Sequence, residues 1–399
     1  MRRPHSVASF EPCRQTENGG RACENARQVE DRCLNSPRDF TIAMKTFTQQ
    51  RRWEQACGML VEMQTQALKP DLISFSAAIS ACEKGGRWED AMGMLAHMSA
   101  QHLQPDVIVY SAATSACEKG EQWLRALDML TVMHKQRLQP DVIIYSAAIS
   151  ACEKGGQWAR ALETLVQMEK RRLEPGVISY NAAISACEKS GRWEKALRML
   201  TEMSEQLLEP HVITFNAVIS AYEKGEQWER ALWTMEDLRY HRLEPDVISY
   251  SAVISACEEC EQWEQALLML MEMQKQDLEP YMISYSAAIS ACEKGKQAEK
   301  ALDLLRGMQQ RGLTPNVITC NAAISACSKG QQPASALNLF HSMDRQGLTP
   351  DVITYNAAIT ACERGQWSDS ALELLQEMQQ RSVAPNVITY NAAISACEK

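Results

Sequence analysis

Short polar side chains recur every 35 residues along this chain, and each can donate or accept hydrogen bonds. Places are counted from the first residue of each copy; one copy starts at Leu72, so Ser76 is at its fifth place. The fifth-place residues are Thr41, Ser76, Ser111, Ser146, Asn181, Asn216, Ser251, Ser286, Asn321, Asn356 and Asn391. Residues that merely suit a helix's first turn would drift to Glu, Gln or Ala over many copies, and these do not. The narrow alphabet therefore favours recognition of a Watson–Crick edge.

The last place of each copy is more variable. The last-place residues are Asp71, Asp106, Asp141, Gly176, His211, Asp246, Tyr281, Asn316, Asp351 and Asn386. Aspartate and asparagine can take part in base recognition, but they can equally cap the helix of the following copy. The residues alone leave both interpretations open.

An apolar row and a basic row accompany the polar residues. The isoleucine row, at the second place, is Ile73, Ile108, Ile143, Ile178, Ile213, Ile248, Ile283, Ile318, Ile353 and Ile388. The basic row is Lys84, Lys119, Lys154, Lys189, Lys224, Lys294, Lys329, Arg364 and Lys399, with Glu259 as the exception. The isoleucines can pack at the helix entry or form platforms between which bases insert. The basic row suits phosphates or a solvated face, and the acidic row immediately before it, from Glu83 to Glu398, should partly neutralise it.

An internal repeat of fixed period positions these rows. The first copy, over residues 37–71, is diverged in sequence. Complete copies start at 72, 107, 142, 177, 212, 247, 282, 317 and 352, and a partial copy covers 387–399. Such a period predicts a repeat array that grows by stacking, without one enlarging core. We expect the array over residues 37–399, after a mostly disordered lead-in over 1–36.

Each copy is predicted to fold as two antiparallel helices. In the copy 72–106, four apolar residues fall on one helical face, namely Phe75, Ala78, Ile79 and Cys82. Ser74 can accept hydrogen bonds from the first-turn N–H groups, and Gly85-Gly86 ends the helix. A second stripe starts at Trp88 and stops before Pro105. The expected fold is an all-α solenoid of about ten helix-turn-helix repeats.

Two further repeated positions are interpreted as core. Tryptophan recurs from Trp53 to Trp263, and we expect looser packing where Ala298 and Pro333 replace it. Nine cysteines occupy one place, from Cys82 to Cys397. Equivalent atoms of stacked helices lie ~10 Å apart, beyond disulfide reach, so these are expected to be small core residues in a reducing compartment.

Composition excludes several classes of protein. Hydrophobic residues at 45% and charged residues at 23% are ordinary for a folded protein, and no apolar run approaches a membrane span. The net charge of −9 weighs against unselective nucleic-acid binding. The sequence offers no clustered histidines, phosphate loop or dinucleotide motif, so we predict no catalytic residue, metal or cofactor. Arginines in the lead-in resemble a transit segment, but its acidic residues make a weak one.

A 35-residue hairpin that opens Val-Ile-Thr-Tyr-Asn and closes Leu-x-Pro-Asp resembles the pentatricopeptide repeat family, in its P-type arrangement, over residues 37–399. The resemblance implies a right-handed superhelix whose first helices line a concave groove. It implies that this groove binds single-stranded RNA at about one nucleotide per repeat, typically in mitochondria or chloroplasts. The isoleucine row would then stack bases, and the basic row would contact phosphates.

In the family, fifth- and last-place residues together select the base. The matching pairs are Thr41/Asp71, Ser76/Asp106 and Ser111/Asp141 for G, Ser286/Asn316 for A, Asn216/Asp246 and Asn321/Asp351 for U, and Asn356/Asn386 for a pyrimidine. The copies with Ser146, Asn181 and Ser251 end in Gly176, His211 and Tyr281, which have no assignment. The implied ligand is GGGnnUnAUY, read 5′ to 3′.

We therefore expect a non-catalytic, monomeric single-stranded RNA-binding protein of organellar RNA processing, stability or translation. It would act alone or by recruiting a processing or nuclease partner. The alternative is a protein-binding scaffold without RNA affinity, which the acidic row and net charge favour. A nuclease or editing factor would need a further C-terminal domain.

Overall fold

The computed structural model describes residues 36–398, and among these it contains helices and no strand. The predicted lead-in, apart from Ser36, and Lys399 lie outside the described residues. The chain divides into two compact units, one ending at Gly155 and the other beginning at Gly156.

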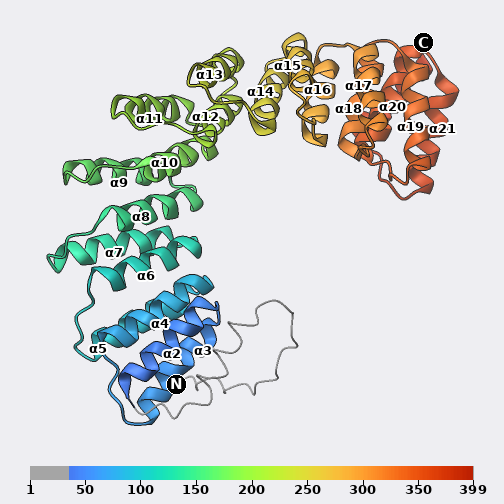
Figure 1. The fold of residues 1–399 in the computed structure, drawn as a ribbon. Helices are drawn as coiled ribbons and strands as arrows, with labels where there is room; N and C mark the ends of the chain where they lie inside the picture. Colours follow the sequence, from blue (N-terminus) through green and yellow to red (C-terminus); the bar gives the residue numbers. More distant parts are fainter. Residues whose placement is uncertain (1–35, 399) are drawn as a thin grey trace. The chain divides into compact units, whose positions relative to one another are not determined.

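Both units are stacks of helices that follow one another in chain order (Figure 1). The first unit contains α2 (Pro37–Gln49), α3 (Trp53–Thr65), α4 (Leu72–Gly85), α5 (Trp88–Ala100), α6 (Val107–Lys119), α7 (Trp123–Lys135) and α8 (Val142–Lys154). The second contains α9 (Trp158–Lys170), α10 (Val177–Lys189), α11 (Trp193–Glu205), α12 (Val212–Lys224), α13 (Trp228–Tyr240), α14 (Val247–Glu259), α15 (Trp263–Lys275), α16 (Met282–Lys294), α17 (Ala298–Gln310), α18 (Val317–Lys329), α19 (Pro333–Arg345), α20 (Val352–Gly365), α21 (Ser368–Gln380) and α22 (Val387–Glu398).

Even-numbered helices are the first helices of the copies, and odd-numbered helices are the second. Within a unit, each first helix contacts the next first helix, as α4 contacts α6 and α18 contacts α20. It also contacts the second helix of its own copy, as α4 contacts α5. The predicted all-α solenoid of helix-turn-helix repeats is thereby confirmed.

Where the last place is aspartate or asparagine, its side chain caps the first helix of the next copy. Asp71 is extended and accepts the Ser74 backbone N–H at 2.8 Å. Asp106 and Asp141 accept the third-place N–H groups of α6 and α8 in the same way. The expectation that Ser74 caps its own helix is wrong, because the free N–H groups are met by a side chain three residues earlier. α4 is followed by its C-cap residue Gly86, whose φ of 66° suits a residue without Cβ.

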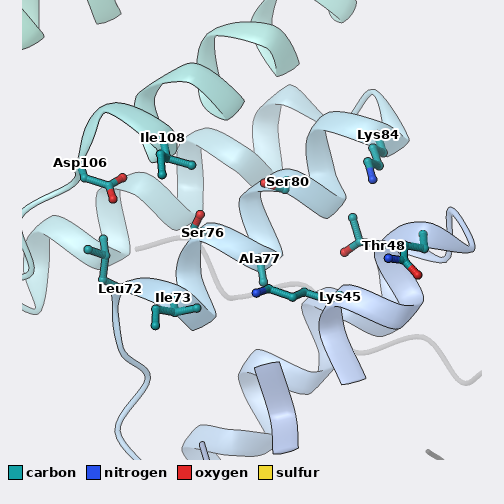
Figure 2. Close-up of a pocket in the computed structure, with 11 residues that line it drawn as sticks. Lys45, Thr48, Leu72, Ile73, Ser76, Ala77, Ser80, Lys84, Asp106 and Ile108 are labelled. Atoms are coloured by element: carbon teal, nitrogen blue, oxygen red, sulfur yellow. The ribbon is translucent and has the colours of Figure 1, made fainter. Parts of the chain in front are cut away.

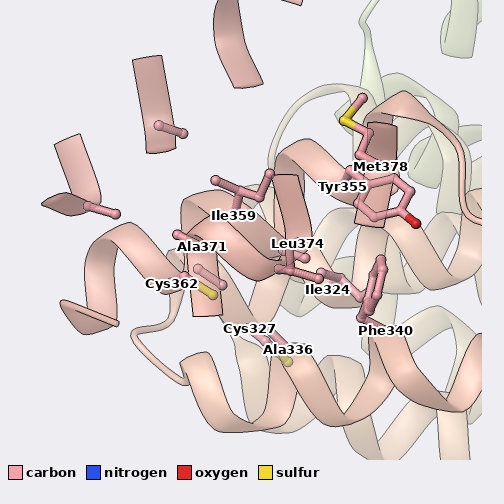
Figure 3. Packing of buried hydrophobic residues seen from close by; sticks show 14 of the residues in the cluster. Ile324, Cys327, Ala336, Phe340, Tyr355, Ile359, Cys362, Ala371, Leu374 and Met378 are labelled. Carbon is pink, nitrogen blue, oxygen red and sulfur yellow. The ribbon is translucent and has the colours of Figure 1, made fainter. Parts of the chain in front are cut away.

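The core lies between the two layers of helices, and it is well packed where tryptophan is lost. Figure 3 shows Phe340 and Tyr355 meeting edge to face among the buried residues of α18 to α21, with ring centroids 5.0 Å apart. Ala298 is only 4% exposed, and a Cβ added to Gly330 would lie 2.7 Å from its Cβ. The expected looser packing is not seen at Ala298, because the alanine is buried and lies directly against the glycine of the next copy, as tryptophan does in other copies.

Tryptophan packs at the joints between copies and is only half-buried. Trp88 lies against Gly120 of the next copy, so closely that a Cβ on Gly120 would be 2.2 Å from Trp88 Cδ1. Arg87 lies over the Trp53 ring, 5.0 Å from its centroid. The predicted core role is therefore only partly right, because one side of each indole remains at the surface.

The repeated cysteines are small core residues, as expected, from Cys82 to Cys362. Burial raises the pKa of the Cys117 thiol to about 11. Cys82 Sγ also lies 3.3 Å from the Sγ of Cys57, which is outside the repeated place, and both are free thiols. Between residues 36 and 398, no helix combines the length and apolarity that a bilayer crossing requires.

Candidate nucleic-acid interface

The isoleucine row lies outside the core. Its exposed fractions run from 55% at Ile73 to 73% at Ile213, although α4 and α12 are otherwise well buried. An exposed large apolar side chain at the same place in all copies from residue 72 onward is not explained by packing at the helix entry. The row therefore presents flat apolar surface at regular intervals within each unit.

The fifth-place residues lie deeper than the isoleucines. Thr41, Asn216 and Asn321 are buried, at 7% to 8% exposure. Of the others, Ser76, Ser111, Ser146, Asn181, Ser251, Ser286 and Asn356 are half-buried, and Asn391 is exposed. Most of these side chains thus keep only part of their polar surface open to solvent.

Three of the predicted pairs of fifth- and last-place residues are directly hydrogen-bonded. Asn216 Nδ2 donates to Asp246 Oδ1 at 3.0 Å, and Asn321 Nδ2 donates to Asp351 Oδ1 at 3.1 Å. Asn356 Nδ2 lies 3.4 Å from Asn386 Oδ1. Residues 30 positions apart in the sequence therefore meet at the boundary between copies.

Other predicted pairs meet indirectly or not at all. Ser286 Oγ lies 2.6 Å from Thr319 Oγ1, which donates to Asn316 Oδ1 at 2.8 Å. Thr41 is joined to Asp71 through Ser74 in the same manner. For the predicted pairs Ser76/Asp106 and Ser111/Asp141, and for the unassigned Ser251 and Tyr281, the described part of the chain shows no hydrogen bond between the two members.

A pocket of about 470 Å³ in the first unit brings the four kinds of residue together. Figure 2 shows Ser76 between Ile73 of its own copy and Ile108 of the next, with Asp106 beside Ile108. All come from α4 or from the entry to α6. The pocket thus has apolar walls and polar groups between them.

Basic residues line the other end of the same pocket. Lys45 of α2 and Lys84 of α4 are both part of its lining, with Thr48 nearby (Figure 2). One of these, Lys84, belongs to the basic row, whereas Lys45 was not singled out from the sequence. A ligand here would therefore meet apolar, hydrogen-bonding and cationic groups in succession.

A second pocket, of about 500 Å³, repeats the arrangement in the other unit. Its apolar lining includes Ile318 and Ile353, and Asn321 and Asp351 stand at its polar centre. Arg364 lines it from the end of α20. Two pockets far apart in the sequence are thus built from equivalent places.

The acidic row binds the basic row across copies. Glutamate of one copy pairs with lysine of the next in Glu83–Lys119 at 2.8 Å, Glu118–Lys154 at 3.0 Å, Glu188–Lys224 at 2.5 Å and Glu293–Lys329 at 2.9 Å. Lys294 is shared between Glu258 at 3.8 Å and Glu259 at 3.3 Å. The predicted neutralisation is thus present, and it joins neighbouring copies.

Among the described residues, two members of the basic row, Lys84 and Arg364, have no glutamate of the preceding copy to pair with. The residue 36 positions before Lys84 is Thr48, where later copies have glutamate. For Arg364 it is Ser328, whose backbone carbonyl accepts from the guanidinium at 3.1 Å. Both lie in the two pockets described above. Positive charge without a carboxylate partner is therefore available in both pockets.

One glutamate of the acidic row has lost its partner. Glu259 stands where Glu223 would otherwise meet a lysine of the next copy. Burial raises the pKa of Glu223 to about 7, Lys224 opposes this shift, and Glu188, Glu258 and Glu259 add to it by repulsion. Uncompensated negative charge is therefore concentrated at the contact between α12 and α14.

Sequence reasoning missed the third-place residue, which bridges many fifth- and last-place pairs. It is Ser74, Ser179, Thr214, Ser249, Ser284, Thr319, Thr354 or Thr389, and each is fully buried. The restriction to serine and threonine was visible in the sequence. Ser74 was interpreted there only as a cap, and its side chain was not connected with the preceding copy.

No group of three or more His, Cys, Asp or Glu side chains within residues 36–398 is arranged to hold a metal ion. The polar groups of the pockets instead offer hydrogen bonds and charge.

Stacked 35-residue helical hairpins, with exposed isoleucines and boundary-spanning polar pairs, define a helical-repeat protein. A family model described as "Pentatricopeptide repeat domain" matches residues 58–119, 128–190, 268–330 and 338–399. One described as "PPR repeat family" matches residues 210–259, and one described as "PPR repeat" matches 178–206, 248–278 and 318–348. Because these matches cover more than half of it, the chain belongs to the pentatricopeptide repeat family.

Solved structures share the fold. The pentatricopeptide repeat protein PPR10 from maize is 22% identical, with 94% of this chain and 55% of that chain covered and a TM-score of 0.58. The same protein in complex with an 18-nt psaJ RNA element is also 22% identical, with coverage of 94% and 54% and a TM-score of 0.45. The chain thus spans about half the length of PPR10. No curated protein matches it.

Proposed function

We propose that this chain binds single-stranded RNA sequence-selectively, with each base read by one pair of fifth- and last-place residues. The observation that carries the proposal is the pocket around Ser76. There a polar pair, Ser76 and Asp106, lies between Ile73 and Ile108, and Lys84 lies further along the same lining. A nucleotide has the same three parts: a flat apolar face, a polar edge and a phosphate.

Spacing and exposure support insertion of a base between isoleucines. The exposed side chains of Ile73 and Ile108 belong to successive first helices that pack on one another. A base between them would cover apolar surface on both faces, a binding mode typical of proteins that read unpaired RNA. Its Watson–Crick edge would then point at the fifth- and last-place side chains.

The family resemblance supplies the base assignments, and they remain part of the proposal. The hydrogen-bonded pairs Asn216/Asp246 and Asn321/Asp351 would read U, and the seven assigned pairs together would read GGGnnUnAUY. Lys84 and Arg364, which lack carboxylate partners in the described residues, are suited to make the firmest phosphate contacts. The ion-paired lysines would have to exchange glutamate for phosphate.

A gel-shift titration of the full chain tests the proposal. The RNA GGGnnUnAUY should bind more tightly than a scrambled RNA of the same composition and than single-stranded DNA of the same sequence. Equal binding of the scramble would contradict base reading, and no binding at moderate salt would contradict RNA binding altogether.

We further propose that the chain acts without catalysis, as a monomer, in organellar RNA processing, stability or translation. The family resemblance supports this placement. RNA held along the pockets would be shielded from nucleases or remodelled, or a bound processing enzyme would be brought to it. Import of a tagged precursor into isolated mitochondria and chloroplasts would test the compartment.

A protein-binding scaffold is the second candidate function, and one surface favours it. Trp233 and Tyr240 on α13 are each 84% exposed and line a pocket of about 800 Å³ together with Arg230 and Asp237. Large exposed aromatic side chains are typical of protein interfaces. Failure of the RNA titration would make this surface the leading candidate site.

A further inference from the structure

The third-place hydroxyl is buried where the fold does not require one. Ser249 and Thr354 are fully buried, but so are Val109 and Ile144 at the same place of other copies. Valine has nearly the shape of threonine, so packing alone accepts an apolar residue here. A hydroxyl at this place must therefore serve something other than the core.

In the second unit, six of these hydroxyls contact the fifth-place side chain of the preceding copy. The distances are 2.7 Å for Thr214 and Asn181, 2.5 Å for Ser249 and Asn216, 2.7 Å for Ser284 and Ser251, 2.6 Å for Thr319 and Ser286, 2.7 Å for Thr354 and Asn321, and 2.5 Å for Thr389 and Asn356. The contact recurs with serine or asparagine at the fifth place. It therefore belongs to the repeat design and not to one base assignment.

Where the fifth place is asparagine, the hydroxyl helps to decide which way the amide faces. Thr354 Oγ1 lies within donating distance of both Asn321 Oδ1, at 2.7 Å, and Asp351 Oδ1, at 2.8 Å, and Asn321 Nδ2 donates to Asp351 Oδ1 at 3.1 Å. The backbone N–H of Asp351 donates to Thr354 Oγ1 at 3.0 Å and holds that oxygen in place. Rotation of the amide by half a turn would set Asn321 Oδ1 against Asp351 Oδ1, two acceptors, and would remove the acceptor to which Thr354 now donates.

The amide orientation decides what a base would meet. With Oδ1 turned to Thr354 and Nδ2 turned to Asp351, one Nδ2 hydrogen and one Oδ1 lone pair of Asn321 remain free. In the flipped amide the free donor and the free acceptor would change places. The side chain would then match a base with the opposite arrangement of donor and acceptor on its Watson–Crick edge. A fixed orientation is therefore a condition for selecting one base.

We propose that the third-place hydroxyl is a positioning residue for base reading, so that the reader is a triad of fifth, last and following third places. This rests on the proposed RNA binding and adds a specificity determinant to it. Two pairs lack the hydroxyl, because Val109 follows Ser76/Asp106 and Ile144 follows Ser111/Asp141. Base selection is accordingly weaker at those two pairs.

Substitution of Thr354 in the full chain tests the proposal. Dissociation constants are measured for RNAs that differ only at the ninth nucleotide of GGGnnUnAUY, which is assigned to Asn321 and Asp351. Thr354→Val should reduce the preference for U by about fivefold, the value of one hydrogen bond. Thr354→Ser should keep the preference, and both variants should leave the preference at the sixth nucleotide unchanged.

Val109→Thr is the converse variant. It supplies the missing hydroxyl beside Ser76 and Asp106, and it should sharpen the preference for G at the second nucleotide. Its own stability is followed by thermal unfolding, so that a packing change is separated from a change in reading.

The outcomes distinguish this proposal from the function on which it rests. If the unaltered chain prefers U and Thr354→Val keeps that preference, or loses affinity equally for all four bases, the positioning role is overturned and RNA binding stands. If the unaltered chain binds none of these RNAs, the proposed function is overturned and the positioning role falls with it.

Discussion

Lys119 Nζ lies 2.8 Å from Glu83 Oε1, and these two residues belong to successive copies, 36 positions apart. The same offset joins Glu118 to Lys154 and Glu293 to Lys329. The side chains are partly exposed, so each pair stabilises its joint by at most about 1 kcal/mol. The paired glutamates also neutralise lysines that RNA phosphates would need. Paired and unpaired members of the basic row should therefore contribute differently to RNA binding.

Lys84→Ala should weaken RNA binding more than Lys119→Ala. Lys84 has Thr48 where other copies have glutamate, whereas the loss of Lys119 also changes the state of Glu83. The logarithm of the RNA association constant falls linearly with the logarithm of the salt concentration. Loss of one phosphate contact on single-stranded RNA should make this slope less negative by about 0.7. The measurement is a salt titration of binding by both variants.

Thr48→Glu is the matched control for Lys84. It places a carboxylate at the position from which later copies pair with the basic row, and it should weaken binding nearly as much as Lys84→Ala. Equal slopes for the unaltered chain and Lys84→Ala would show that Lys84 meets no phosphate.

Stability should fall as the pH rises from about 5 to about 8, and Glu223 should contribute to the fall. Its pKa is raised from 4.5 to about 7, mainly by burial. The folded state therefore binds the proton more tightly than the unfolded state, and the stability contributed by protonation is present below pH 4.5 and lost as the pH rises through 7. Thermal unfolding of Glu223→Gln should show a flatter pH dependence.

Glu259→Lys should repair the same joint. It restores the residue type found at this place in the other copies and gives Glu223 a partner in α14, while Lys294 loses Glu259 and keeps Glu258. We expect a gain of at most about 1 kcal/mol at pH 8 and little at pH 4, because the benefit requires ionised Glu223. An equal gain at both pH values would point to a cause other than this ion pair.

Asn216→Ser combined with Asp246→Asn should move the preference at the sixth nucleotide from U toward A. The family resemblance assigns this serine–asparagine combination to A, as in Ser286/Asn316, and Ser249 remains in place to contact the new serine. The change in discrimination should be about 1–3 kcal/mol. Competition binding with RNAs that differ at this nucleotide measures it, and an unchanged preference for U would refute the assignment.

Gly120→Ala should destabilise the first unit by about 1–3 kcal/mol, because its Cβ would lie 2.2 Å from Trp88 Cδ1 and the indole would have to move. Gly93→Ala is the matched control. No neighbouring atom lies within 4 Å of the added Cβ at Gly93, which is inside α5, so that change should stabilise by about 0.5–1 kcal/mol. Chemical unfolding of both variants measures the difference; equal effects would show that the Trp88 contact is unimportant.

The sequence predicted the repeat and its helices closely because local rules decide them. The stripe of Phe75 and Cys82, the glycine turn and Pro105 place α4 and α5 within a few residues of their observed ends. The isoleucines were correctly placed off the core, because helical spacing separates them from that stripe.

Features that depend on the offset between copies could not be derived in the same way. Glu83 and Lys84 are neighbours in the sequence, yet Glu83 pairs with Lys119, because stacking sets adjacent copies one residue out of register. Trp88 was interpreted as core, but it lies against Gly120 at a joint. The hydroxyl of Ser249 was missed because its partner, Asn216, lies in the preceding copy.

The contact between Thr354 and Asn321 has a consequence for how such an array can be rearranged. Asn321 and Asp351 belong to the copy 317–351, whereas Thr354 belongs to the copy that follows. If residues 317–351 were moved in front of a copy that begins as 107–141 does, the pair would meet Val109 in place of a hydroxyl. The base that a copy selects would then depend on the copy that follows it. The RNA specificity of an array would therefore be set by the order of its copies as well as by their identity.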